Sequence, residues 1–86
     1  MHWNYRIVKG VSKESGKEFF VIKEVDYDAL GGIASISEDP VYPLGDTLND
    51  LQRDFKLMQR AFKKKMIDEQ NVEYGLPEGA IDEQIR

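Results

Sequence analysis

The sequence predicts an α+β fold in which three strands form an antiparallel meander and one long amphipathic helix packs on one face of that sheet. Three observations favour this fold. Three N-terminal segments are rich in residues that favour β structure, a segment with two prolines follows at 39–44, and an apolar stripe at the helical period runs from Gly45 to Lys65. At 86 residues, one domain is expected over residues 1–70, with an acidic, partly mobile tail over 71–86.

The first predicted strand spans residues 3–9, where Trp3, Tyr5 and Ile7 alternate with polar residues. Alternation of this kind is typical of a half-buried strand, so these three side chains are expected to point inward. Residues 10–17 are polar with glycine at both ends, which indicates a hairpin loop.

The second predicted strand, residues 18–25, is apolar on both faces, with Phe19 and Val21 on one side and Phe20 and Ile22 on the other. One helix cannot cover both faces. This strand is therefore expected to be central, and its second face to meet either the C-terminal segment or another subunit. The four residues are candidates for an oligomer or partner interface, and ordinary core packing is the alternative.

Residues 26–32 are expected to form a turn and residues 33–38 a third strand. Residues 39–44 contain two prolines, which exclude a central strand and predict an extended crossing from the sheet to the helix. A short fourth edge strand is predicted around residues 71–74.

The helix has a clear start and an apolar seam. Thr47 is a good N-cap because its hydroxyl can accept a hydrogen bond from the backbone N–H of Asp50. Acidic residues lie early and basic residues late, which opposes the helix dipole. We expect the seam to be buried against the sheet; its members are Leu48, Leu51, Phe55, Met58 and Phe62.

Charge is unevenly distributed along a chain whose net charge is −4. The net charge is −2 over residues 1–45, +3 over 46–65 and −5 over 66–86. Phosphate repels an acidic chain, which disfavours nucleic-acid binding and makes a basic protein partner electrostatically easier to meet. The alternative is a nucleic-acid contact through the basic stripe of the helix, although no aromatic residue is interleaved on that stripe; its residues are Arg53, Lys56, Arg60, Lys63 and Lys64.

Chemistry-bearing motifs are sparse. The sequence has no cysteine, one histidine (His2), no P-loop and no nucleophile elbow, so no catalytic, metal or cofactor-binding residue is assigned and an enzyme is not expected. Residues 26–33 match four positions of an EF-hand calcium loop, but Leu30 and Ser37 occupy two ligand positions, which favours an ordinary turn. The absence of a signal sequence and of a run of about 18 apolar residues predicts a cytoplasmic protein that does not enter a membrane.

The order of strands, proline crossing and capped helix resembles the HicB-like antitoxin N-terminal domain and short bacterial proteins of that type. The resemblance covers roughly residues 3–66 and implies a βββα scaffold. It does not extend to the C-terminal DNA-binding module of full antitoxins, and no motif supports toxin neutralisation. The matching residues are Tyr27-Asp28, Gly31, Glu38-Asp39-Pro40 and Gly45-Asp46-Thr47-Leu48.

These observations together predict a small, non-enzymatic protein-interaction module that forms homo-oligomers. The two-sided apolar strand at residues 18–25 motivates that expectation.

Overall fold

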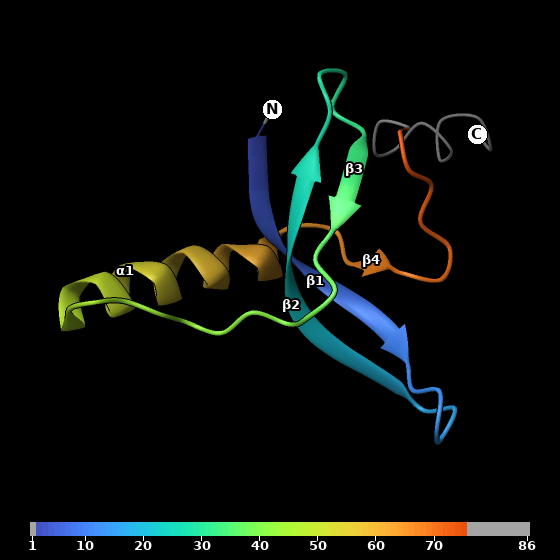
Figure 1. Cartoon of the computed structure of the whole chain (residues 1–86), viewed down its shortest axis with the longest axis horizontal. Helices are drawn as coiled ribbons and strands as arrows, with labels where there is room; N and C mark the ends of the chain where they lie inside the picture. Colours follow the sequence, from blue (N-terminus) through green and yellow to red (C-terminus); the bar gives the residue numbers. More distant parts are fainter. Residues whose placement is uncertain (1, 76–86) are drawn as a thin grey trace.

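The computed structural model describes residues 2–75 and confirms an α+β architecture, a sheet accompanied by one helix (Figure 1). The helix α1 continues into a 3₁₀ turn, η1, and the chain then returns to the sheet. In chain order the elements are β1 (His2–Val11), β2 (Glu18–Tyr27), β3 (Ile33–Ile36), α1 (Leu48–Gln59), η1 (Arg60–Lys63) and β4 (Ile67–Asp68).

The sheet has the strand order β3-β2-β1-β4, so the long strand β2 is internal, as predicted. Strands β1, β2 and β3 form the predicted antiparallel meander, with Ile7 opposite Ile22 and Val25 opposite Ile36. The wholly antiparallel sheet is a wrong prediction, because β4 pairs parallel to β1. The fourth strand also lies at Ile67–Asp68 and not at residues 71–74, because the chain meets the open edge of β1 as soon as it leaves η1.

One core cluster lies between the sheet and the end of the helix. Tyr5 is buried with Met58 and Ala61, and Ile7, Ile22 and Val41 pack around them. Residues two apart on a strand point to the same face, which is why Tyr5 and Ile7 both meet the helix. Trp3 shares this face but is 51% exposed, so the inward orientation predicted for Trp3, Tyr5 and Ile7 holds only in part.

The opposite face carries a second core cluster. Its buried members are Val8, Val25, Tyr27, Ile33 and Ile67, and Val72 packs against them. Beyond β4 the chain lies over this face, and the backbone N–H of Gly75 donates to the carbonyl of Ile33 at 2.9 Å. Of the two occupants predicted for the second face, the structure shows the C-terminal segment covering part of it. The tail predicted to be partly mobile spans residues 71–86, and the part of it after residue 75 lies outside the described residues.

The helix is shorter and more exposed than the sequence predicts. It spans Leu48–Gln59 plus the 3₁₀ turn and not all of residues 45–65. Met58 is the buried residue of α1, and Ala61 is the buried residue of the 3₁₀ turn. The buried seam is therefore a wrong prediction for the rest of the stripe. Figure 1 shows the physical reason: the extended segment after β3 carries the chain away from the sheet, so the helix begins far out. It meets the sheet only over its second half, from Asp54 to Met58. The exposed seam residues are Leu48, Leu51, Phe55 and Phe62.

Two local predictions are confirmed. The Thr47 hydroxyl caps α1 by accepting from the backbone N–H of Asp50 at 3.1 Å. In the turn between β2 and β3, Gly31 has φ +86°, a conformation that side-chain-bearing residues rarely adopt. No helix within residues 2–75 is both long enough and apolar enough to cross a bilayer.

Candidate interaction surfaces

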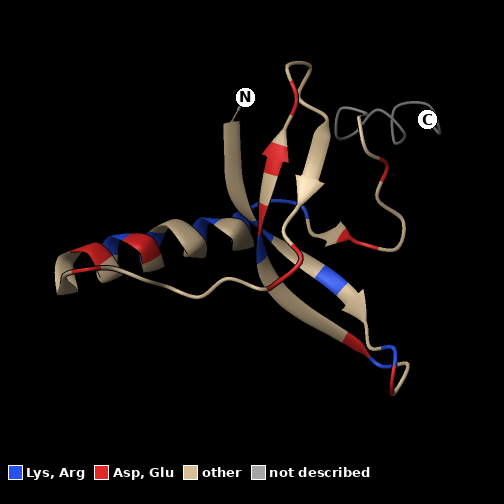
Figure 2. Cartoon of the chain, viewed as in Figure 1, with Lys and Arg blue, Asp and Glu red and all other residues tan. Residues whose placement is uncertain are grey.

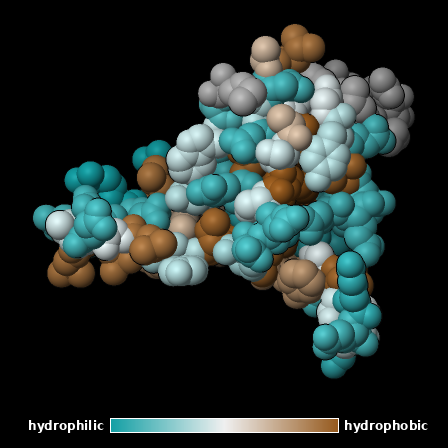
Figure 3. Space-filling model, in the orientation of Figure 1, coloured by the Kyte–Doolittle hydropathy of each residue, from teal (hydrophilic) through white to brown (hydrophobic). Residues whose placement is uncertain are grey.

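The projecting part of α1 presents an apolar surface that nothing else in the described chain covers. Leu48 is 80% exposed, Phe55 50% and Leu51 38%. Pro43 joins Leu48, Leu51 and Phe55 in lining a shallow hollow along the helix, and the neighbouring Leu44 is 63% exposed. Figure 3 shows hydrophobic residues along the lower edge of the projecting part of the molecule. We call Pro43, Leu48, Leu51 and Phe55 the seam surface.

A single carboxylate fixes the seam surface in place. Oδ1 of Asp54 accepts a hydrogen bond from the hydroxyl of Tyr5 on β1, and Oδ2 accepts from the backbone N–H of Leu44, both at 2.9 Å. Burial and the neighbouring Asp54 raise the pKa of Tyr5 to about 12. Asp54 therefore ties the sheet, the helix and the crossing segment together, and this sets the direction in which the helix projects.

Close contact between the crossing segment and the helix requires glycine at position 45. A Cβ atom built on Gly45 would lie 2.2 Å from the backbone nitrogen of Leu51, which is far inside van der Waals contact. In the Gly45-Asp46-Thr47-Leu48 motif, glycine is therefore required for steric reasons, and threonine is explained by its role as the helix cap. The motif is explained by the geometry of the helix start.

The four candidate interface residues on β2 do not form one surface. Val21 packs with the core cluster of the far face, whereas Ile22 packs with the cluster beside the helix. Phe19 is 40% exposed and lies over Gly10, and Phe20 is 59% exposed on the other side of the strand. Strands β1 and β2 extend as an arm beyond the rest of the sheet (Figure 1), so its two phenylalanines are exposed on opposite faces.

The predicted basic stripe is exposed along its whole length, and Figure 2 shows its positive charge along α1 and η1. The structure adds an aromatic residue that the sequence did not place there. Trp3, from the start of β1, lines a hollow together with Leu57, Arg60 and Lys64. The two segments lie more than fifty residues apart in the chain, so no local pattern could indicate this contact. The stripe residues are Arg53, Lys56, Arg60, Lys63 and Lys64.

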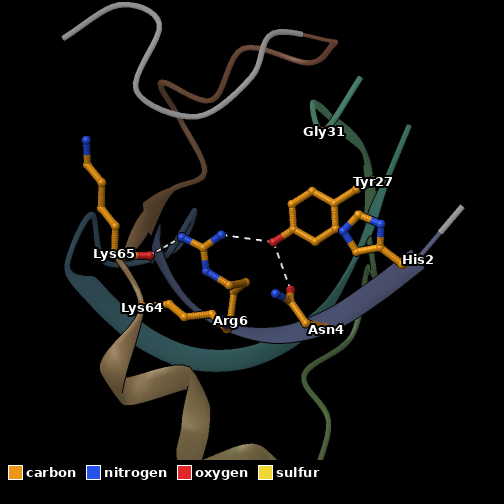
Figure 4. A pocket seen from close by; sticks show the side chains of 7 residues that line it. All are labelled: His2, Asn4, Arg6, Tyr27, Gly31, Lys64 and Lys65. Carbon is orange, nitrogen blue, oxygen red and sulfur yellow. Dashed lines mark hydrogen bonds between the residues drawn. The ribbon is translucent and has the colours of Figure 1, made fainter. Parts of the chain in front are cut away.

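A polar pocket on the other side of β1 contains a buried arginine that sequence reasoning missed (Figure 4). Arg6 is 2% exposed; it donates to the Tyr27 hydroxyl at 2.9 Å and also to the backbone carbonyl of Lys65. The Tyr27 hydroxyl donates in turn to Asn4 at 2.8 Å, and His2 stacks on the Tyr27 ring with centroids 5.0 Å apart. This network joins β1, β2 and the chain after η1, which is a structural role.

The carboxylates of the EF-hand-like segment at residues 26–33 accept hydrogen bonds from their own turn and from the strand that follows it. Oδ1 of Asp28 accepts from the backbone N–H groups of Leu30 and Gly32 at 3.0 and 2.9 Å, and Asp26 accepts from the Ser35 hydroxyl at 3.1 Å. Across residues 2–75, no three side chains of the types that ligate metals lie close enough together to hold an ion.

Comparisons of the chain with protein-family models, with curated proteins and with solved structures gave no match. The surfaces are therefore interpreted from their own geometry. The seam surface is apolar and displayed on a projecting helix, the hollow at Trp3 is aromatic and basic, and the pocket at Arg6 is lined by side chains that hydrogen-bond to one another.

Proposed function

We propose that this protein is a small, non-enzymatic interaction module, cytoplasmic and built on a HicB-like scaffold, that self-associates and binds other proteins. The observation that carries the proposal is the helix α1, which exposes most of its apolar stripe. Within residues 2–75 these side chains are left largely exposed, and a contiguous exposed apolar surface is typical of an interaction site.

The energetic argument compares the helix with an ordinary surface. Isolated exposed apolar residues are normal, but neighbouring ones on a regular element form a patch that gains about 25 cal/mol per Å² when it is covered. Leu48, Leu51 and Phe55 are neighbours of this kind, since they recur at three and four residues on one side of the helix. Covering them favours association with another protein surface.

The HicB-like scaffold is supported by the order of elements and by the turn and helix-start residues that match. These residues have local structural causes here: Gly31 adopts positive φ and Thr47 caps the helix. The match therefore supports a shared architecture and carries no argument for toxin neutralisation.

Self-association is tested by measuring the solution mass by sedimentation from low to high micromolar concentration. The expected result is a dimer or larger species that dissociates on dilution. Leu48→Ser combined with Phe55→Ser should shift the equilibrium towards monomer, because it removes apolar area from the seam surface. Phe20→Ser is the matched control on the β1–β2 arm. A wild-type chain that stays monomeric at high micromolar concentration refutes self-association.

A second candidate function is single-stranded nucleic-acid binding, and the hollow at Trp3 is the observation that favours it. An indole beside Arg60 and Lys64 offers a stacking surface next to two cations, which is the combination such proteins use. Because the chain contains one tryptophan, quenching of its fluorescence by an oligonucleotide reports binding directly.

Binding through this hollow should weaken as salt rises and should be lost in Arg60→Glu with Lys64→Glu, while Lys13→Glu in the hairpin loop leaves it unchanged. Absence of quenching at low salt rules this function out.

A further inference from the structure

We propose that the hollow at Trp3 and the pocket at Arg6 form one binding site for single-stranded nucleic acid, with a base stacked on Trp3 and the adjoining phosphate held in the pocket. This inference rests on the second candidate function and adds the phosphate site and the path of the strand. It starts from the linings of the two cavities, because Asn4 and Lys64 belong to both. Trp3 and Arg6 point to opposite faces of β1, so the two cavities adjoin across this strand.

The edge of β1 between the two cavities is not covered by another strand of residues 2–75. Along this edge β4 pairs with β1 only at Val8 and Lys9, whereas the other edge of β1 pairs with β2 over its whole length. Figure 1 shows the N-terminal half of β1 at the outer margin of the sheet. A flexible chain of nucleotides can therefore cross this edge beside Asn4 and Lys64, from one face of β1 to the other, without opening the fold.

The charges along this path fit a polyanion. On the pocket side, Lys64 and Lys65 lie with the guanidinium of Arg6. On the side of the hollow, Lys64 lies with Arg60. Among the described residues, neither lining includes a carboxylate, and Figure 2 shows the positive charge continuing from the end of the helix towards β4. The path is basic on both faces of β1, which favours the binding of consecutive phosphate groups.

The pocket holds its cation in a fixed position. The Arg6 guanidinium donates to the Tyr27 hydroxyl at 2.9 Å and to the backbone carbonyl of Lys65, and Figure 4 shows it between these two groups. The Tyr27 hydroxyl donates to Oδ1 of Asn4 at 2.8 Å, which leaves the Nδ2 group of Asn4 as a hydrogen-bond donor. Because these groups are ordered before a ligand arrives, binding a phosphate costs little further ordering of the protein.

The hollow supplies the stacking surface. Trp3 is 51% exposed and packs against the Tyr5 ring at an interplanar angle of 81°, with ring centroids 5.1 Å apart. This edge-to-face contact holds the indole and leaves much of it exposed to a ligand. Every base has a flat aromatic face, so stacking on Trp3 is expected to tolerate any base. The site is therefore expected to bind single strands with little sequence preference.

The first test measures quenching of the single tryptophan by a thymidine hexanucleotide at low salt, with the full chain. The main variant is Lys65→Glu, because Lys65 lines the pocket and not the hollow. This substitution keeps the backbone carbonyl to which Arg6 donates. It should weaken binding at least about tenfold and reduce the slope of log affinity against log salt by about 0.7, the value for one phosphate contact with a single strand.

The matched control is Lys56→Glu, which makes the same charge change on α1 outside both cavities. It should weaken binding less than about threefold, because salt screens a charge that does not touch the ligand. Far-ultraviolet circular dichroism checks that both variants are folded.

The second test changes the ligand and keeps the protein. A thymidine hexanucleotide with neutral methylphosphonate linkages should bind wild type at least about tenfold more weakly than the charged strand, because no phosphate charge enters the pocket. Lys65→Glu should bind this neutral strand as tightly as wild type does, since the substituted position then faces no charge. A loss of equal size for the charged and the neutral strand overturns the phosphate site.

The outcomes separate this inference from the function on which it rests. If Lys65→Glu binds the charged strand like wild type while Arg60→Glu with Lys64→Glu does not bind, the phosphate site is overturned and the second candidate function stands. Equal losses in Lys56→Glu and Lys65→Glu place the strand along the helix and overturn the path across β1. Thymidine 5′-phosphate that binds as tightly as the hexanucleotide indicates a free mononucleotide, and hexaglutamate that competes equally indicates charge alone; either result overturns the single-stranded ligand. Absence of quenching at low salt overturns both proposals.

Discussion

The hydrogen bond from Tyr5 to Asp54 joins β1 to the middle of α1 and so helps to fix the direction in which the helix projects. Tyr5→Phe removes this hydrogen bond while keeping the aromatic ring. The hydroxyl donates to a carboxylate at 2.9 Å in a partly buried position. Hydrogen bonds to charged groups contribute about 1.5–3 kcal/mol, and partial exposure lowers this figure, so we expect a loss of about 1–2 kcal/mol in the free energy of unfolding. For a chain of this size each kcal/mol lowers Tm by about 4–8 °C.

The same substitution has a signature in alkaline solution. The folded pKa of Tyr5, about 12, lies above the unfolded value of 10.0. Between these values the folded state retains a proton that the unfolded state releases, so stability falls as the pH rises from 10 towards 12. A phenylalanine has no proton to lose. The difference in stability between wild type and Tyr5→Phe should therefore shrink over this pH range.

Urea unfolding followed by far-ultraviolet circular dichroism at neutral and alkaline pH measures both effects. Tyr42→Phe is the matched control, because Tyr42 is 69% exposed and its hydroxyl is not tied to the helix. The reasoning is refuted if Tyr5→Phe is as stable as Tyr42→Phe at pH 7, or if the two variants lose stability in parallel between pH 10 and 12.

Three further outcomes are expected. Met58→Ala should cost about 2–4 kcal/mol in thermal unfolding, because Met58 is 3% exposed under the sheet, and a loss below about 1 kcal/mol would show that the helix end is not packed there. Glu69→Ala should destabilise the fold more than Lys23→Met in urea titrations. Glu69→Ala leaves the buried Lys23 ammonium without the carboxylate that lies 3.0 Å away, whereas Lys23→Met removes the buried positive charge itself. The reverse order of stabilities would contradict an ion pair between these two side chains. A hydrogen bond from Asn71, helped by Lys9, holds the pKa of Asp68 below its usual value of 3.8, so the stability that the Asp68 carboxylate contributes is present above pH 3.8 and is lost as the pH falls through the folded pKa. Asn71→Ala should therefore move acid unfolding to higher pH, and an unchanged acid midpoint would contradict this.

The β-strands show how far local pattern reaches. Alternation around Tyr5 and Ile7 and the two-sided character of β2 were enough to predict a central strand in an antiparallel meander, and the structure has that strand order for β1 to β3. The fourth strand was misplaced because two residues pairing with β1 leave no periodic signal of their own. Its position depends on where the helix ends, which is a tertiary matter.

The candidate surfaces divide in the same way. The basic stripe could be read from the sequence because a helix brings residues three and four apart onto one side. The arrival of Trp3 beside Arg60 and the burial of Arg6 could not, because both depend on contacts between segments more than fifty residues apart. Sequence patterns report neighbours along an element, whereas these surfaces are made of neighbours in space.

The sequence by itself predicted a helix within residues 45–65, with Thr47 as its cap and one apolar side, and the structure has that helix over Leu48–Gln59. Only the tertiary structure decided what that apolar side faces. Hydrophobic periodicity specifies which side of a helix avoids water, but the covering surface is set by the length and direction of the crossing segment and by the Asp54 contacts that hold it. Within residues 2–75 the sheet covers only the end of the helix, and its exposed seam is where this chain is expected to meet another.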